Sequence, residues 1–137
     1  ADVQHAVTAG GISVGESMIH AAAAANAAWR AGGGPEQALE AGAGGSPMGP
    51  VGLVIGATIG SLPPRGAQMI AQVGGPILAP GVGWQGAGAA DLERLFGQAR
   101  QLVLATSSRA VAGAGPDAGK LAAAVGKCAE SVSFLGN

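Results

Sequence analysis

The sequence predicts an α/β fold in which short parallel strands alternate with helices. Three apolar runs, at Val51–Ala57, Ile77–Ala79 and Leu102–Ala105, are typical of strands that are covered on both faces of a parallel sheet. Helical patterns lie before, between and after these runs, so the expected order is α-β-α-β-α-β-α. Strands that alternate with helices in this way are usually joined by right-handed crossovers. The 137 residues are enough for one domain with a core.

The first helix is expected from Ser13 to about Arg30. Ser13 and Glu16 have the spacing of a capping box, in which each residue satisfies a backbone donor of the other. The expected inward face consists of Val14, Met18, Ile19, Ala22 and Trp29. The glycines before Pro35 should end this helix. Residues 35–50 are interpreted as a connector with one short helical turn near Glu36–Ala41.

Three further helices are expected in the second half of the chain. One covers about Pro64–Val73, and the next covers about Ala89–Arg100. The second of these should turn Leu92, Leu95 and Phe96 inward. Pro116 should open the last helix, whose apolar residues recur at spacings of three and four. This stripe consists of Leu121, Val125, Cys128, Val132 and Leu135.

The composition excludes several classes of protein. Seven Lys and Arg stand against eight Asp and Glu, a balance that argues against a nucleic-acid surface. No apolar segment reaches about 18 residues without Gly or Pro, so no membrane span is expected. The chain start, Ala1–Gln4, has no signal-peptide pattern. Cys128 stands alone on an apolar helix stripe and is interpreted as a core residue of a reduced, cytoplasmic protein.

Two consecutive strands end in residues that suit a phosphate group. Ile77–Ala79 leads into Pro80–Gly86, a glycine-rich loop, and the next strand ends in Thr106–Arg109. Gly81 and Gly83 would let the backbone approach a ligand closely. A guanidinium fork at the start of a helical turn, as expected for Arg109, is well suited to a phosphate dianion.

The expected sheet has too few strands to close. Three strands leave both edges open, and the chain begins with a helix, as though a preceding strand were missing. This order is typical of the C-terminal half of a (β/α)₈ TIM barrel, in which sites lie at the carboxyl ends of the strands. Residues 1–137 are therefore interpreted as that half, with strands six to eight present and strands one to five outside this chain.

The loop and its partner carry a resemblance to a known family. Pro80–Gly86 reads P-G-V-G-W-Q-G, and together with Ser108-Arg109 after the next strand it resembles orotidine 5′-phosphate decarboxylase. Val54–Thr58 resembles the sixth strand of that family, and Ala112–Pro116 resembles the segment before its last helix. The resemblance covers nearly the whole chain at matching spacings.

The resemblance implies a role in pyrimidine nucleotide synthesis. Enzymes of this family convert orotidine monophosphate to uridine monophosphate and CO₂ without a metal or an organic cofactor. By resemblance, Gln85 bridges phosphate and pyrimidine, and Arg109 binds phosphate together with the backbone N–H groups of Ser108 and Arg109. Pro80 and Val82 match positions that line the base, and Gly81, Gly83 and Gly86 form the phosphate loop. A homodimer is also implied, and Trp84 has no assigned role.

The family's catalytic Lys and Asp array has no counterpart in this sequence. That array has the spacing D-x-K-x-x-D and belongs to earlier strands. The lysines of this chain, Lys120 and Lys127, fall on the expected last helix, and Asp2, Asp91 and Asp117 lie at the chain start or at helix starts. No catalytic residue is assigned, and the chain alone is expected to be inactive without a complementary N-terminal half.

Two other functions remain open on the sequence. One is a non-catalytic module that binds phosphate or a nucleotide, and the other is a different phosphate-binding barrel enzyme, such as an isomerase of phosphosugars.

Individual residues also have interpretations that involve no ligand. Arg109 could be a surface residue at a helix start, Gln85 could be an ordinary turn residue, and His20 is interpreted as half-exposed packing.

Overall fold

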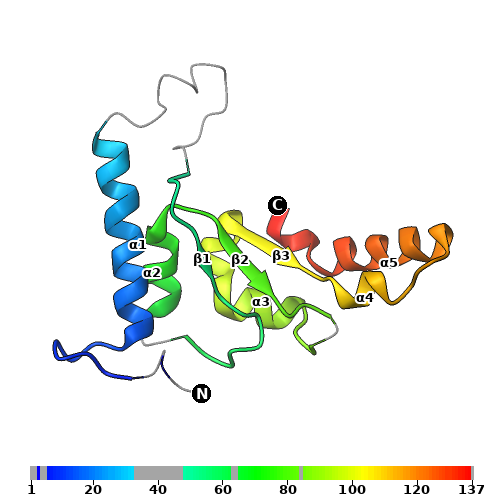
Figure 1. The fold of residues 1–137 in the computed structure, drawn as a ribbon, viewed down its shortest axis with the longest axis horizontal. Coiled ribbons are helices and arrows are strands. Elements are labelled where there is room, and N and C mark those ends of the chain that lie inside the picture. Colours follow the sequence, from blue (N-terminus) through cyan, green and yellow to red (C-terminus); the bar gives the residue numbers. More distant parts are fainter. Residues whose placement is uncertain (1–2, 4–5, 33–47, 63–64, 84, 137) are drawn as a thin grey trace.

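The described residues form a three-stranded parallel sheet that carries helices on one of its faces (Figure 1). The structure, a computed structural model, describes residues 3, 6–32, 48–62, 65–83 and 85–136. The expected turn at Glu36–Ala41 and the side chain of Trp84 lie outside these residues. The elements are α1 (Val14–Ala31), β1 (Leu53–Val54), α2 (Gly66–Val73), β2 (Ile77–Pro80), α3 (Ala89–Phe96), η3 (Gly97–Leu102), β3 (Val103–Thr106), α4 (Arg109–Ala112), α5 (Ala118–Ser131) and η4 (Ser133–Gly136).

The strands lie in the order β1-β2-β3 and confirm the predicted parallel sheet. β1 is shorter than the predicted run Val51–Ala57. Its chain nevertheless stays paired beyond Val54, because the N–H of Ile55 donates to the Leu78 oxygen at 2.9 Å and the N–H of Ala57 donates to the Pro80 oxygen at 2.8 Å. The three strands therefore run side by side up to their carboxyl ends.

Helix α1 begins with the predicted capping box. The Ser13 hydroxyl accepts a hydrogen bond from the Glu16 N–H at 3.1 Å, and the Glu16 carboxylate accepts one from the Ser13 N–H at 3.0 Å. Ile19 is buried as expected, whereas Met18 is 57% exposed, so its placement on the inward face was wrong. The buried side of α1 is formed by Ile19, Ala22 and Asn26.

Helices α2 and α3 cover one face of the sheet. As predicted, α3 buries Leu92, Leu95 and Phe96. It ends at Phe96, before the predicted Arg100, and continues as the short 3₁₀ helix η3. Apolar side chains of these helices pack against those of the strands and form the core. Its largest members are Ile70, Val73, Ile77, Leu92, Leu95 and Phe96.

The other face of the sheet carries an exposed apolar row. Val54, Leu78 and Leu104 are aligned across the three strands by the register of the sheet. Their side chains are 70%, 38% and 59% exposed, respectively. The expectation that the strands are covered on both faces is therefore wrong for the described residues. An uncovered apolar row is what half of a barrel would present on its inner side.

Helix α5 stands off from the sheet. Asp117 caps it, accepting a hydrogen bond from the Lys120 N–H at 2.8 Å. α5 packs on α4 and η4 and projects away from the strands (Figure 1). Val125 is therefore 52% exposed and Cys128 is half-buried, so the interpretation of Cys128 as a core residue was wrong.

Among the described residues, no helix combines the length and the apolar character that a membrane span requires.

Asn26 joins three segments on the buried side of α1. Its side chain is completely buried. Its amide nitrogen donates to the Val51 oxygen at 2.8 Å and to the Val73 oxygen at 2.9 Å, and its amide oxygen accepts from the Val51 N–H at 2.9 Å. One side chain thus satisfies backbone groups at the entry to β1 and at the end of α2, and its bond to the Val73 oxygen is fully buried.

Replacing Asn26 should destabilise the protein strongly. Asn26→Ala leaves two carbonyls and one N–H without their partner, and each unsatisfied group costs about 1–3 kcal/mol. We expect the free energy of unfolding to fall by about 2–4 kcal/mol, measured by urea denaturation. Gln72→Ala, at an exposed position of α2, is the matched control and should change it by less than about 0.5 kcal/mol. Equal stability of the two variants would contradict this account of Asn26.

Candidate functional site

The loops after β2 and β3 meet at one edge of the sheet. The register places Pro80 beside Thr106 at the carboxyl ends of the two strands. Just beyond this pair, the Ser107 hydroxyl donates a hydrogen bond to the Val82 oxygen at 3.1 Å. The two loops are therefore in direct contact, as the sequence predicts for neighbouring parallel strands.

A small cavity of about 140 Å³ lies between these two loops. All five predicted substrate-binding residues line it, namely Pro80, Val82, Gln85, Ser108 and Arg109, together with Gly81, Thr106 and Ser107. Gly83 and Gly86 shape the loop and are not among the lining residues. Sites for small molecules usually measure about 300–1,000 Å³, so a cavity of this size suits one polar group of a ligand.

The backbone of the glycine loop requires glycine at its first turn. Gly81 has a φ of +103°, which residues with a side chain rarely adopt. A Cβ atom at Gly81 would also lie 2.8 Å from the side-chain oxygen of Gln85. The Gln85 side chain thus folds back over Gly81. The loop is closed by the Gly83 N–H, which donates to the Ala87 oxygen at 2.9 Å.

The second loop offers groups that attract an anion. Arg109 is the first residue of α4, as predicted, and its side chain is exposed beside the cavity. The hydrogen bonds of α4 begin with the Ala112 N–H, which donates to the Ser108 oxygen at 2.8 Å. Amides at the very start of a helix have no partner within it. Among the described residues, none that lines the cavity is acidic, so a phosphate group fits its chemistry.

Gln85 separates this cavity from a second one of about 230 Å³. The second cavity lies between the loops after β1 and β2 and is lined in part by Thr58, Gly60, Asp91 and Arg94. Ser107, Thr58 and Arg94 were not predicted from the sequence as site residues. Ser107 could have been found, because it lies directly beside Ser108 in the same strand-end motif.

Asp91 is held by two donors at the start of α3, where its helix-start position was predicted. Its carboxylate accepts hydrogen bonds from the Gly88 N–H at 3.0 Å and from the Arg94 guanidinium at 3.0 Å. These bonds, first that of Gly88 and then that of Arg94, lower the pKa of Asp91 below the ordinary value of 3.8. The start of α3 thus stabilises the charged form of the Asp91 carboxyl group.

The remaining polar candidates lie away from the cavity between the loops. Lys120 and Lys127 are exposed on α5, and His20 is exposed on α1. In the described part of the chain, no three or more His, Cys, Asp and Glu side chains gather as a metal site would require.

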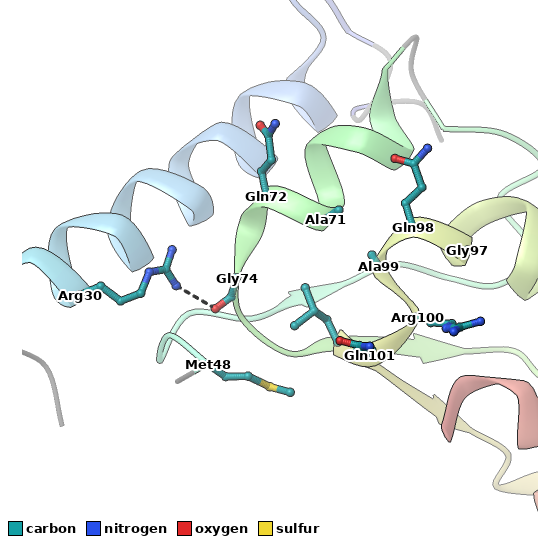
Figure 2. Close-up of a pocket in the computed structure, with 11 residues that line it drawn as sticks. Arg30, Met48, Ala71, Gln72, Gly74, Gly97, Gln98, Ala99, Arg100 and Gln101 are labelled. Carbon is teal, nitrogen blue, oxygen red and sulfur yellow. Dashed lines mark hydrogen bonds between the residues drawn. The ribbon is translucent and has the colours of Figure 1, made fainter. Parts of the chain in front are cut away.

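A larger hollow, of about 600 Å³, lies among the described residues at the opposite end of the sheet (Figure 2). Arg30 and Arg100 both border it. Arg30 is engaged with the end of α2, because its guanidinium donates to the Gly74 oxygen at 3.2 Å. Arg100 lies on the far side of the hollow and points away from Arg30 (Figure 2). The two guanidinium groups do not converge on one point, so we assign no site there.

The loop geometry predicts that Gly81 cannot be replaced without cost. Gly81→Ala combines a strained positive φ with a clash against Gln85, and such strain costs about 1–3 kcal/mol. We expect urea denaturation to show a loss of this size. Gly126→Ala is the matched control, because Gly126 lies within α5 and no atom lies within 4 Å of an added Cβ there. If both variants lost the same stability, the turn geometry would be refuted.

The contacts of Asp91 predict a carboxyl group whose pKa lies below the ordinary value. Because its pKa is lower in the folded protein than in the unfolded chain, its contribution to stability is present at neutral pH. That contribution is lost only as the pH falls below 3.8 and then through the lower pKa that Asp91 has in the folded protein. A carboxyl ¹³C titration by NMR should give a pKa below 3.8 for Asp91, and a value at or above it would contradict these contacts.

Comparison with known proteins supports the family resemblance. No protein-family model matches the sequence. The chain is 44% identical over 124 residues to orotidine 5′-phosphate decarboxylase of Salinispora arenicola, covering 90% of this chain and 37% of that protein. It is 39% identical over 131 residues to the Streptomyces coelicolor enzyme of the same name, covering 96% of this chain and 40% of that protein.

A solved structure gives the same result. A crystal structure of a candidate orotidine 5′-phosphate decarboxylase from Streptomyces avermitilis superposes with a TM-score of 0.72 and 36% sequence identity. The match covers 98% of this chain and 40% of that one. The chain therefore spans about two fifths of the length of the relatives it matches. Over nine tenths of its length, this chain is similar to the C-terminal part of orotidine 5′-phosphate decarboxylases, the family that its glycine loop and Ser-Arg corner resemble.

Proposed function

We propose that this chain supplies the phosphate-binding loops of an orotidine 5′-phosphate decarboxylase. The observation that carries the proposal is the convergence of Gln85 and Arg109, from two loops, on one cavity without an acidic lining. The reaction of the complete enzyme breaks the bond between the pyrimidine ring and its carboxylate. CO₂ leaves, the electron pair stays on the ring carbon, and a proton from the enzyme or solvent takes its place.

The phosphate would be held by charge and by backbone donors. The Arg109 guanidinium can place two parallel N–H donors on a phosphate, which Lys cannot do. The N–H groups of Ser108 and Arg109, at the start of α4, would add donors from the other side. The cavity of about 140 Å³ suits the phosphate alone, so the nucleoside would extend beyond it.

Gln85 would connect the phosphate to the base. Its side-chain amide offers both donors and an acceptor, and it lies between the two cavities. Pro80 and Val82, which line the first cavity, would contact the pyrimidine side of the ligand. Binding energy gained at the phosphate can position the distant ring for the chemical step.

The catalytic Lys and Asp groups would come from the remaining part of the barrel. The apolar row Val54, Leu78 and Leu104 is exposed on the inner side of the sheet, and large exposed apolar surfaces usually have a partner. The other strands of a closed barrel would cover this row. Further proposals are a homodimer and no requirement for a cofactor, which rest on the family resemblance, and a cytoplasmic location, which rests on the lone Cys128.

The alternatives make different predictions about ligands. A decarboxylase should bind uridine monophosphate far more tightly than ribose 5-phosphate, because Gln85 and the base-lining residues add contacts to the nucleotide. A phosphosugar isomerase should show the reverse preference. A non-catalytic nucleotide module would bind uridine monophosphate and release no CO₂ from orotidine monophosphate in the full-length protein.

Loss of Arg109 should weaken nucleotide binding. Arg109→Ala in the full-length protein removes a charge-assisted contact worth about 1.5–3 kcal/mol. We expect the dissociation constant for uridine monophosphate, measured by calorimetry, to rise about 10- to 150-fold. Arg100→Ala, at an arginine outside the cavity, is the matched control and should leave it unchanged. Unchanged affinity in Arg109→Ala would remove Arg109 from the site.

A further inference from the structure

Arg94 connects the loop after β1 to the loop after β2. One end of its guanidinium donates to the Gly60 oxygen, and the other contacts the Asp91 carboxylate at 3.0 Å. The second carboxylate oxygen of Asp91 accepts the Gly88 N–H at 3.0 Å, where the Gln85 loop ends. Arg94 and Asp91, here called the clasp, therefore hold two loops that are 28 residues apart in sequence, as counted from Gly60 to Gly88.

The clasp closes the side of Gln85 that faces away from the phosphate cavity. Arg94, Asp91 and Gln85 line the same second cavity, together with Thr58 and Gly60. The Gln85 side chain is exposed, so packing alone does not fix its position. The Gln85 oxygen and the Thr58 methyl group both border Gly81, because they lie 2.8 Å and 3.4 Å from the position of an added Cβ there. A shift of the loop after β1 would therefore change the space open to Gln85.

The contacts of Arg94 and Asp91 contribute little to the free energy of unfolding of the whole protein. The side chains of Arg94 and Asp91 are 48% and 40% exposed, and ion pairs with such exposure contribute little to unfolding free energies. A guanidinium bonded at both ends instead defines a geometry, because its fork is rigid and planar. Small errors in the placement of binding groups are costly to ligand recognition.

We propose that Arg94 and Asp91 are positioning residues, which hold the loops after β1 and β2 at a fixed separation and thereby direct the Gln85 amide toward the nucleotide. The inference rests on the proposed function of the Gln85 loop. Neither clasp residue lines the phosphate cavity, whereas Gln85 lines both cavities, so in this proposal Gln85 carries the effect of the clasp to the phosphate side.

A double-mutant cycle in the full-length enzyme tests this route. Arg94→Met should raise the dissociation constant for uridine monophosphate by about five- to tenfold, with a smaller increase for Arg94→Lys, which can keep one contact. In a Gln85→Ala background, Arg94→Met should have no further effect. Arg100→Met, at an arginine outside both cavities, is the control and should leave the affinity unchanged. Independent, additive effects of Arg94→Met and Gln85→Ala would overturn the proposal.

A second measurement tests the clasp independently of whether the protein binds a nucleotide. Hydrogen exchange of the ligand-free protein should be faster in Arg94→Met at residues 57–61 and 86–88, and partly restored in Arg94→Lys. Unchanged exchange there would overturn the clasp, whatever the protein binds. A different result is faster exchange in Arg94→Met together with unchanged nucleotide affinity in both Gln85→Ala and Arg109→Ala. In that case the clasp does hold the two loops, but the proposed function fails. The role of the clasp in nucleotide binding then fails with it.

Discussion

The candidate site depends on the parallel register of β2 and β3. Because Pro80 lies beside Thr106, the two following loops begin at the same level and at the same edge of the sheet. The hydrogen bond from Ser107 to the Val82 oxygen then holds them together. A shift of one residue in this register would turn alternate side chains to the other face of the sheet and separate the two loops. Both the cavity and its positive lining follow from this one alignment.

The register is supported from one side of the sheet. Helices α2 and α3 pack their apolar residues against the strands, and Asn26 of α1 satisfies the backbone where β1 is entered and where α2 ends. The opposite side, with Leu78 at its centre, remains open in this chain. The fold thus builds the two loops on a well-packed layer, and in our proposal the open side faces the further strands of the barrel.

The sequence was sufficient for the features that are local. The capping box at Ser13 and the order of strands and helices follow from short motifs and periodicity. The cavity residues Gln85 and Arg109 could be predicted because each follows a strand end, and parallel strands bring such ends together. The relatives then confirm the resemblance that those loops carry.

Features that depend on distant partners could not be predicted. Asn26 lies in a run of alanines, and its partners are backbone groups 25 and 47 residues away. Arg94 is an ordinary exposed helix residue in the sequence, and its contact with Gly60 depends on how two loops fold. Cys128 was misplaced because an apolar helix stripe indicates burial, whereas α5 packs on α4 and η4 and leaves that stripe partly open.

The most direct test of the central claim is a crystal structure of the full-length protein with uridine monophosphate. The account predicts that the phosphate lies between the two loops, with its oxygens about 3 Å from the Arg109 guanidinium, the Gln85 amide and the N–H groups that begin α4. A nucleotide bound elsewhere, for example in the large hollow between Arg30 and Arg100, would contradict it.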